Sequence, residues 1–158
     1  MPVTITLGQR KIIDAARRII IDHGMEKLTV REIANHLELT DGALYRHFSG
    51  KKEIISLLID DIEESLLSAI DNAAANTYGP LEKLENIFRS HLSYVEKRKG
   101  VSFIVINNTL SMKDGDLQNK VFRLVQKYMD RIKTILEEGM VQGIFRRDLD
   151  LEDRKSVV

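Results

Sequence analysis

The stretch that decides the fold is residues 28–55, LTVREIANHLELTDGALYRHFSGKKEII. Its apolar residues recur three and four positions apart, which is the spacing of one face of a helix. Thr29-Val-Arg-Glu32 has the form of a capping box, in which the Thr hydroxyl and the Glu carboxylate accept hydrogen bonds from free backbone N–H groups. Thr40 can cap a second helix over residues 41–48. The stretch predicts two short helices joined by a tight turn, followed by the start of a longer helix.

Within this unit the apolar and polar side chains separate by position. We expect the core of the unit to be formed by Ile33, Ala34, Leu37, Leu39, Leu44 and Phe48. The outer side of the second helix would then carry Thr40, Asp41, Gly42, Ala43, Tyr45, Arg46 and His47. Gly42 has no side chain, so the backbone can come close to another surface there. These features favour a helix-turn-helix, in which the second helix enters the major groove of DNA.

Three side chains are candidates for contacts to base edges. Arg31, on the exposed side of the first short helix, could pair with a guanine. Ala43 could contact a thymine methyl group, and Asp41 could accept from a cytosine amine. The charge of Asp41 would repel phosphates, so its role as a contact is the weakest of the three.

Phosphate contacts are expected beside them. Lys51 and Lys52 lie at the start of the following helix, whose free N–H groups also attract a phosphate. Taken singly, these lysines, Tyr45 and His47 are equally well explained as a solvated helix face. Together with the caps, the turn and the core at matching spacing, they favour a DNA-binding surface.

The rest of the chain has the same helical spacing almost throughout, so we predict an all-α protein. The expected helices cover residues 8–23, 29–37, 41–48, 50–76, 81–98, 101–112 and 117–142, with a short eighth helix near residue 152. The fourth is on the order of 40 Å long and could bridge two lobes. We therefore expect an N-terminal helix-turn-helix DNA-binding domain, residues 1–50, and a C-terminal helical ligand-binding and dimerisation domain, residues 51–158.

The C-terminal helices also have predicted inner faces. On the fifth helix we expect the inward residues to be Leu84, Ile87, Phe88, Leu92 and Val95. On the seventh we expect Val121, Leu124, Val125, Tyr128, Ile132, Ile135, Leu136 and Met140. The sixth helix is apolar on most sides and is predicted to be central.

Several function classes are disfavoured by the composition. The 158 residues include no Cys, which excludes a disulfide framework and a thiolate metal site. The four His are scattered, and there is no His-x-x-x-His pair or glycine-rich phosphate loop, so we expect no enzyme activity, no metal and no cofactor. The longest purely apolar runs have four residues and the N-terminus lacks a secretory pattern, so we expect no membrane span and a cytoplasmic location. Net charge is zero, so only local placement of basic groups can support DNA binding.

A small-molecule site in the C-terminal part would need an apolar cavity with a few polar groups. The candidate lining residues are His91, Tyr94, Asn107, Asn108, Met112, Tyr128 and Met129. Each has an alternative explanation as a core or surface helix residue. The paired amides Asn107 and Asn108 are the strongest candidates, because a buried amide in an apolar helix needs hydrogen-bonding partners. No ligand can be named from the sequence.

Residues 29–58, TVREIANHLELTDGALYRHFSGKKEIISLL, closely resemble the DNA-binding domain of the TetR family of transcriptional regulators. The resemblance rests on the opening Thr-x-Arg-x-Ile-Ala, the turn, the Gly-x-Leu-Tyr-x-His-Phe helix and the Lys-Glu-Ile after it. Residues 10–24, RKIIDAARRIIIDHG, match the first helix of that family. Residues 143–150, GIFRRDLD, form a phrase of sequence, or motif, that is common in the family after its seventh helix.

The resemblance implies a homodimer that binds a palindromic operator, blocks transcription and is released by a small-molecule inducer. It assigns phosphate contacts to Tyr45, His47, Lys51 and the helix start at Thr29. Arg31, Asp41 and Ala43 would then lie near bases.

Two departures from the family pattern affect these expectations. Glu38 stands in the turn where the family usually has Gly, so a non-Gly residue would take a positive φ. The sequence ends at Val158, where family members usually continue with two more helices that form most of the dimer interface. We therefore expect a C-terminal domain that is incomplete relative to the family, or a dimer formed in another way. The alternative is a helix-turn-helix protein that acts through a protein partner or organises DNA, without small-molecule control.

Overall fold

The computed structural model describes residues 5–45, 48–75 and 77–148, without the side chain of Asp41. The described residues form seven α-helices and one short 3₁₀ helix, and no strand. The helices are α1 (Leu7–His23), the 3₁₀ helix η1 (Met25–Lys27), α2 (Val30–His36), α3 (Asp41–Tyr45), α4 (Lys51–Ala75), α5 (Pro80–Lys97), α6 (Val101–Ser111) and α7 (Gly115–Val141). The all-α prediction is confirmed, whereas the helix predicted near residue 152 lies outside the described residues.

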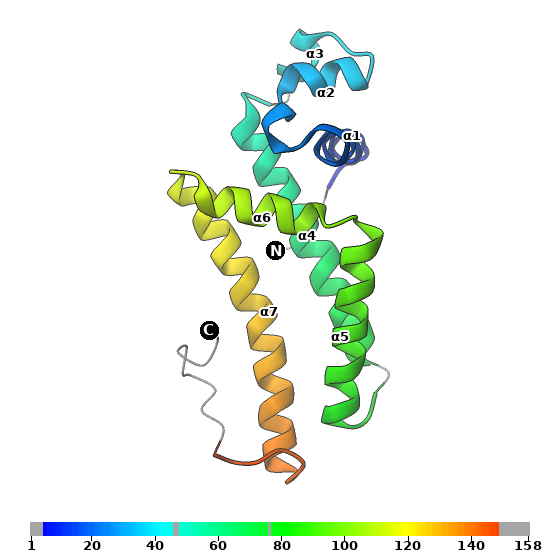
Figure 1. The fold of residues 1–158 in the computed structure, drawn as a ribbon, viewed down its shortest axis with the longest axis vertical. Coiled ribbons are helices and arrows are strands. Elements are labelled where there is room, and N and C mark those ends of the chain that lie inside the picture. The colour runs from blue at the N-terminus through cyan, green and yellow to red at the C-terminus, as the bar shows by residue number, and fades with distance from the viewer. Residues whose placement is uncertain (1–4, 46–47, 76, 149–158) are drawn as a thin grey trace.

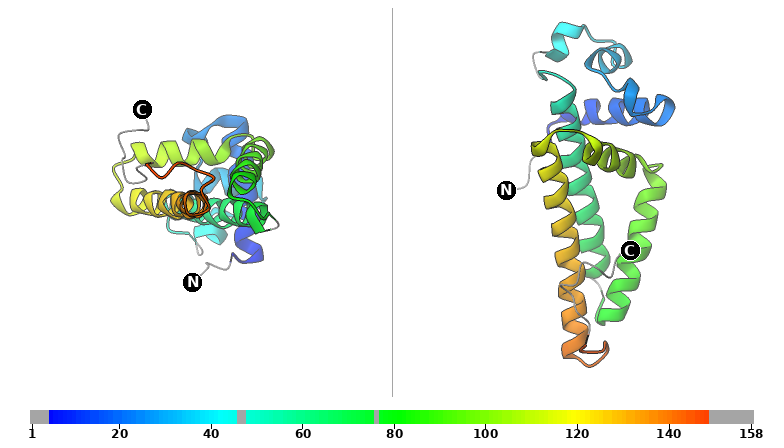
Figure 2. Two further views of the ribbon diagram at one scale, coloured as in Figure 1. Left: turned by 90° about the horizontal axis from the view of Figure 1, so that it is seen from below. Right: turned by 60° about the vertical axis from the view of Figure 1, so that its left-hand side comes forward.

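The long helix α4 connects the two parts of the molecule. Helices α1 to α3 form a small unit at one end, and α4 runs from this unit along the rest of the structure (Figure 1). Helices α5 and α7 pack against α4, while α6 crosses beneath α1, as a second view also shows (Figure 2). With 25 residues, α4 is about 37 Å long. It therefore bridges the two parts, as predicted from its length.

The N-terminal unit, residues 5–50, has a continuous apolar core. Ile33, Ala34 and Leu44 are fully or almost fully buried, and Phe48 is 6% exposed. Leu39 is an exception, because its side chain is 48% exposed where the sequence predicted it in the core. The turn is closed by a backbone hydrogen bond, from Leu39 N–H to the carbonyl of Ala34 at 2.9 Å. The turn therefore does not depend on burial of the Leu39 side chain.

The C-terminal helices bury less of their apolar surface than predicted. Phe88 and Leu92 of α5 are 64% and 53% exposed, and Val125 of α7 is 43% exposed. Helix α6 buries one face and leaves Phe103 70% exposed, so it is not buried on all sides. The physical reason is that α5, α6 and α7 pack mainly against α4 and against each other. A second apolar stripe on each helix has no neighbour among the described residues.

The end of α7 depends on a glycine. Gly143 has a φ of 73°, and the N–H groups of Ile144 and Phe145 both donate to the carbonyl of Gly139, at 2.8 and 3.1 Å. The chain turns back so far that a side chain at Gly139 would collide with the ring of Phe145. This corner contains the first residues of the phrase GIFRRDLD. None of the helices that the structure describes is long and apolar enough to cross a membrane.

Candidate DNA interface

Helix α2 begins at a side-chain cap. The hydroxyl of Thr29 accepts a hydrogen bond from the backbone N–H of Glu32 at 3.1 Å, which satisfies one of the free donors at the helix start. This is one of the two bonds predicted for a capping box there. Both bonds of such a box are present at α1, between Thr6 and Gln9, at 3.2 and 2.9 Å. The exposed Glu32 side chain instead borders a cleft between α1 and α2.

The turn and α3 follow the predicted pattern. Glu38 has a φ of 55°, the left-handed conformation expected at the position where the resembling family has Gly. The hydroxyl of Thr40 accepts from the backbone N–H of Ala43 at 3.3 Å and caps α3. Leu44 is buried on the inner side, and the N–H of Phe48 donates to its carbonyl at 2.9 Å. The inner residues thus attach α3 to the core and leave its other side exposed.

The exposed side contains most of the predicted contact residues that can be placed. Tyr45 is 54% exposed, and Ala43 is half-buried. The other exposed candidates are Thr29, Arg31, Thr40 and Gly42. Arg46, His47 and the side chain of Asp41 lie outside the described residues. The two short helices therefore present hydroxyl, guanidinium and phenol groups on the surface of the N-terminal unit.

The two lysines at the start of α4 are engaged within the protein. The Nζ of Lys51 donates to the carbonyl of Met25 at 2.9 Å, which ties α4 to η1. An ammonium group has two further N–H donors, so a phosphate contact by Lys51 stays a prediction. The Nζ of Lys52 lies 2.9 Å from Asp114 and 3.1 Å from Asp116, and these hydrogen bonds raise the pKa of Lys52. Lys52 therefore connects α4 to the start of α7.

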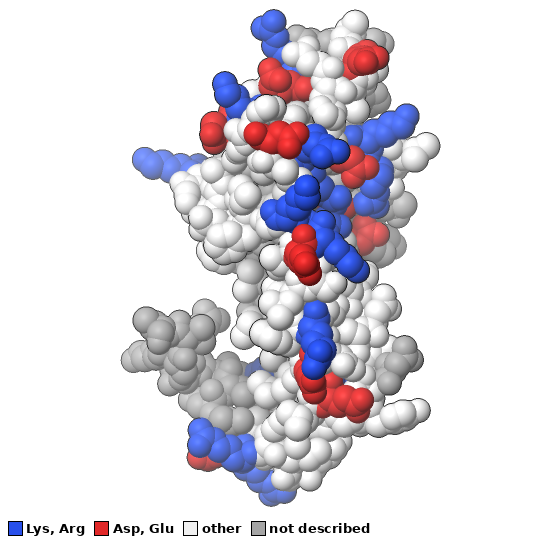
Figure 3. Space-filling view, turned by 45° about the vertical axis from the view of Figure 1, so that its right-hand side comes forward, with Lys and Arg blue, Asp and Glu red and all other residues white. Residues whose placement is uncertain are grey.

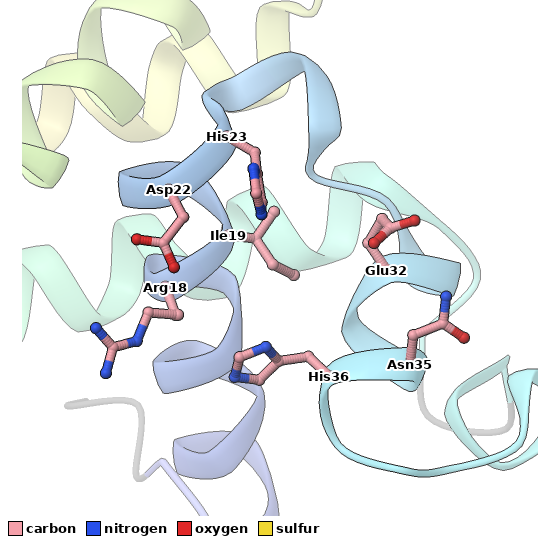
Figure 4. Close-up of a pocket in the computed structure, with 7 residues that line it drawn as sticks. All are labelled: Arg18, Ile19, Asp22, His23, Glu32, Asn35 and His36. Atoms are coloured by element: carbon pink, nitrogen blue, oxygen red, sulfur yellow. The ribbon is translucent and has the colours of Figure 1, made fainter.

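A polar cleft of about 270 Å³ lies between α1 and α2 of the N-terminal unit. Figure 4 shows its lining from α1, with Arg18, Ile19, Asp22 and His23, and from α2, with Glu32, Asn35 and His36. Only one of these side chains is apolar, so the cleft does not suit an apolar ligand. Among the residues that the structure describes, no group of three or more His, Asp or Glu is arranged to hold a metal ion.

In the C-terminal lobe, residues 51–148, two of the predicted ligand residues meet. The rings of His91 on α5 and Tyr128 on α7 pack edge to face, with their centroids 5.5 Å apart. Burial raises the pKa of the Tyr128 phenol. The Nδ1 atom of His91 is buried and has no hydrogen-bond partner. A buried polar nitrogen without a partner is uncommon and is a feature that a ligand could satisfy.

The other predicted ligand residues lie elsewhere. Tyr94 is buried, and its hydroxyl lies 3.0 Å from that of Ser65 and 3.2 Å from that of Ser102. Met112 is half-buried against the core, whereas Met129 is 50% exposed. The expected burial of the paired amides is wrong, because Asn107 and Asn108 are exposed. Helix α6 buries the side that carries Val101, Val105 and Thr109, and the amides fall outside it.

Sequence reasoning missed one buried charge. Asp61 of α4 is 1% exposed and accepts hydrogen bonds from Arg10, Arg17 and Arg98, which are 51, 44 and 37 positions away in the chain. Two signals for it were present: two acidic residues between Ile59 and Ile62 in an otherwise apolar stretch, and two arginines seven positions apart on α1. Neither signal identifies the partner, because the contacts join residues far apart in the sequence.

Two family models together cover most of the chain. The one described as "Bacterial regulatory proteins, tetR family" matches residues 12–58, and "YsiA-like protein, C-terminal region" matches residues 58–158. The transcriptional repressor KstR2 of Mycolicibacterium smegmatis is 26% identical over 142 residues, which are 90% of this chain and 69% of KstR2. The nucleoid occlusion factor SlmA of Haemophilus influenzae is 26% identical over 116 residues. That match covers 73% of this chain but only 53% of SlmA.

The fold is also similar to that of solved regulators. The transcriptional regulator FadR from Bacillus subtilis, whose crystal structure contains stearoyl-CoA, superposes with a TM-score of 0.77. The match covers 90% of this chain and 76% of that one, at 23% identity. At this identity the likeness is one of fold.

Proposed function

Because the chain belongs to the TetR family of bacterial regulatory proteins, we propose that it is a transcriptional repressor that leaves its operator when a small molecule binds. Members of this family are DNA-binding transcriptional regulators, and the relative KstR2 is a repressor by name. The observation that carries the proposal is the pair of capped helices α2 and α3. Their inner residues are buried, and Arg31 and Tyr45 are exposed on them.

The proposed contacts divide between phosphates and bases. We assign phosphate contacts to the α2 start at Thr29, to Tyr45 and to Lys51, with Arg46, His47 and Thr40 beside them. We assign contacts near bases to Arg31, Asp41 and Ala43, with Gly42 allowing close approach. The exposure of Arg31 and Tyr45 supports this assignment.

A gel-shift titration on the DNA upstream of the chain's own gene tests DNA binding. The expected result is binding that weakens steeply as salt rises, because phosphate contacts release counterions. Absence of binding at every salt concentration would contradict the proposal. Tyr45→Phe should weaken binding to all DNA sequences about equally. Arg31→Ala should instead reduce the preference for the operator over other DNA. If Arg31→Ala weakened every sequence alike, Arg31 would be a phosphate contact instead.

We propose further that the repressor is a homodimer, with the second copy covering an apolar face of the C-terminal lobe. The large apolar side chains exposed on α5, α6 and α7 include Leu81, Phe88, Leu92, Phe103, Ile104, Leu110, Phe122, Val125 and Met129. Exposed apolar side chains in such number are typical of an interaction surface. A mass measurement in solution should give twice the mass of the chain. A strict monomer at micromolar concentration would contradict this part of the proposal.

The proposed inducer is a molecule with a large apolar part and a polar group, and it binds near His91 and Tyr128. The unpaired Nδ1 of His91 would bond to a polar group of the ligand, and the Tyr128 ring packed against His91 would contact an apolar part of it. Stearoyl-CoA, which FadR binds in its crystal structure, is a suitable first probe. We expect it to raise the melting temperature of the protein and to release DNA, and His91→Phe to reduce both effects. A melting temperature unchanged by this probe would exclude long-chain acyl-CoA as the inducer.

A second candidate function is supported by the likeness to SlmA, a nucleoid occlusion factor. In that case the protein would organise DNA or act through a protein partner, without a small-molecule switch. The two functions differ in their DNA sites and in their response to ligands. Two results would favour the second function. The protein would bind at dispersed chromosomal sites, and no small molecule in a broad screen would change its DNA binding.

A further inference from the structure

Helices α4 and α5 are joined by a regular series of polar contacts. The hydroxyl of Ser90 donates to the carbonyl of Ala69 at 3.1 Å, and one turn further the hydroxyls of Tyr94 and Ser65 lie 3.0 Å apart. One turn further again, Arg98 donates to Asp61 at 2.8 Å. Each step moves four residues down α4 and four residues up α5, as antiparallel helices require. This polar ladder therefore fixes how far α5 lies along α4.

The ladder ends at Asp61, and the contact there continues into α1. Arg10 donates to one carboxylate oxygen of Asp61 at 2.8 Å, and Arg17 donates to the other. Arg10 and Arg17 are seven positions apart, which is about two helical turns, so both lie on one face of α1. Arg98 shares the oxygen used by Arg17, and its guanidinium lies 4.7 Å from the ring centroid of Tyr94. One carboxylate thus joins the N-terminal unit to the α5–α6 corner.

The burial of charge at this junction requires the contacting groups to stay in defined positions. The Asp61 side chain is 1% exposed, while those of Arg17 and Arg98 are 22% and 19% exposed. A buried carboxylate needs charged hydrogen-bond donors at defined positions, so its partners cannot move independently without loss of free energy. Figure 3 shows Lys and Arg side chains gathered at the height of α1 and of the α5–α6 corner. Asp61 is the buried acid with which Arg10, Arg17 and Arg98 form ion pairs.

We propose that Asp61 is a positioning residue for DNA binding, which sets the orientation of α1 on the C-terminal lobe and passes a displacement of α5 to it through Arg98. Asp61 itself does not touch DNA in this proposal. Tyr94 lies one helical turn from His91, so a ligand near His91 would act on the same side of α5. The DNA-affinity part of the proposal rests on the function proposed above, whereas the structural link between α5 and α1 does not.

Arg98→Gln tests the link without leaving Asp61 unpaired, because Arg10 and Arg17 remain. The matched control is Arg131→Gln, since Arg131 pairs with Asp71 within the C-terminal lobe and contacts no residue of α1. In the DNA-free protein, we expect faster hydrogen exchange of α1 amides in Arg98→Gln and unchanged exchange in Arg131→Gln. Unchanged α1 exchange in Arg98→Gln would overturn the proposal, whatever the protein does with DNA.

Gel shifts then test the consequence for DNA. Arg98→Gln should weaken operator binding roughly five- to tenfold, with the slope of affinity against salt unchanged, because no phosphate contact is lost. Arg98→Lys should restore most of the affinity, and Arg131→Gln should leave it unchanged. A smaller slope of affinity against salt in Arg98→Gln would show that Arg98 is a phosphate contact. Wild-type affinity in Arg98→Gln would show that Asp61 does not position the DNA-binding unit. Either result overturns the proposal, whereas a wild-type protein that binds no DNA contradicts the proposed function instead.

Discussion

Helix α4 is held on its two sides by contacts of different kinds. On the α5 side the contacts are hydroxyl groups and the buried Asp61, with Tyr94 8% exposed at the centre. On the α7 side they are ion pairs near the surface, such as Arg131 with Asp71, whose side chains are 33% and 53% exposed. Both series repeat at helical spacing, but only the first includes polar side chains that are almost fully buried, Asp61 and Tyr94.

The difference separates a contact that fixes position from one that adjusts stability. An exposed ion pair gains little because water solvates both charges when they separate. A buried polar group has no such replacement, so its partners must remain at hydrogen-bonding distance. The contacts of the α5 side are therefore suited to carrying a displacement to α1. The more exposed pairs of the α7 side, such as Lys127 with Glu63, mainly keep the two parallel helices together.

The largest effect is expected for Asp61→Ala. The substitution leaves Arg17 and Arg98 partly buried without their carboxylate, and the expected loss in the free energy of unfolding is about 3–5 kcal/mol. Urea denaturation followed by circular dichroism, at one protein concentration, measures it. Asp71→Ala is the control on the α7 side and should cost about 1 kcal/mol or less. Equal losses for the two variants would remove the distinction between the two sides.

A smaller effect is expected for Tyr94→Phe. The change keeps the ring but removes the hydroxyl that bonds to Ser65 and Ser102, and the Ser102 hydroxyl is then buried without that partner. The expected loss is about 1–3 kcal/mol. Tyr78→Phe is the matched control, because Tyr78 is 96% exposed and should give no change. If both substitutions left urea denaturation unchanged, the hydroxyl contacts would not hold α5 in place.

The sequence was most informative where contacts are local. Caps such as Thr29 and Thr40 act within one helical turn, and the left-handed Glu38 belongs to a four-residue turn, so these features were predicted. The exposure of Leu39 and the 3₁₀ helix η1 were not. Burial of Phe88 or Asn107 depends on which other helices exist and where they lie. An apolar stripe indicates only that a face can be buried, and several helices here have two such stripes. The contacts of Asp61 were not predictable for the same reason, since its partners lie on α1 and at the residue that follows α5.

On the α7 side, Arg131→Gln should reduce the free energy of unfolding by about 0.2–1 kcal/mol at low salt. The bidentate pair with Asp71 is partly exposed, so salt should screen it and the difference from wild type should shrink in 1 M NaCl. The loss in Tyr94→Phe should persist at the same salt concentration, because no charge is involved. A salt-independent Arg131→Gln effect would mean that this side also depends on desolvated contacts.

The smallest effect is expected at the start of α7, where Asp114→Asn changes a charge and keeps the helix cap. Hydrogen bonds from Lys52 and then from the backbone N–H of Leu117 hold the pKa of Asp114 below its ordinary value of 3.8. A carboxylate with a lowered pKa stabilises the fold above its unfolded pKa, and this contribution is lost as pH falls through the folded pKa. Asn still accepts from Leu117 N–H, so only the charge contribution disappears.

The melting temperatures of wild type and Asp114→Asn should therefore differ slightly at pH 7, and the difference should shrink as the pH falls below the ordinary pKa of 3.8 and vanish below the lowered pKa of the folded protein. Glu85→Gln, at an exposed i,i+4 pair within α5, is the control for a charge that connects no two helices. A difference that grew at low pH would have the wrong sign for a paired carboxylate. In that case Lys52 would not be bonded to Asp114 in solution, and the α7 side would contribute even less to the position of α4 than the exposed ion pairs indicate.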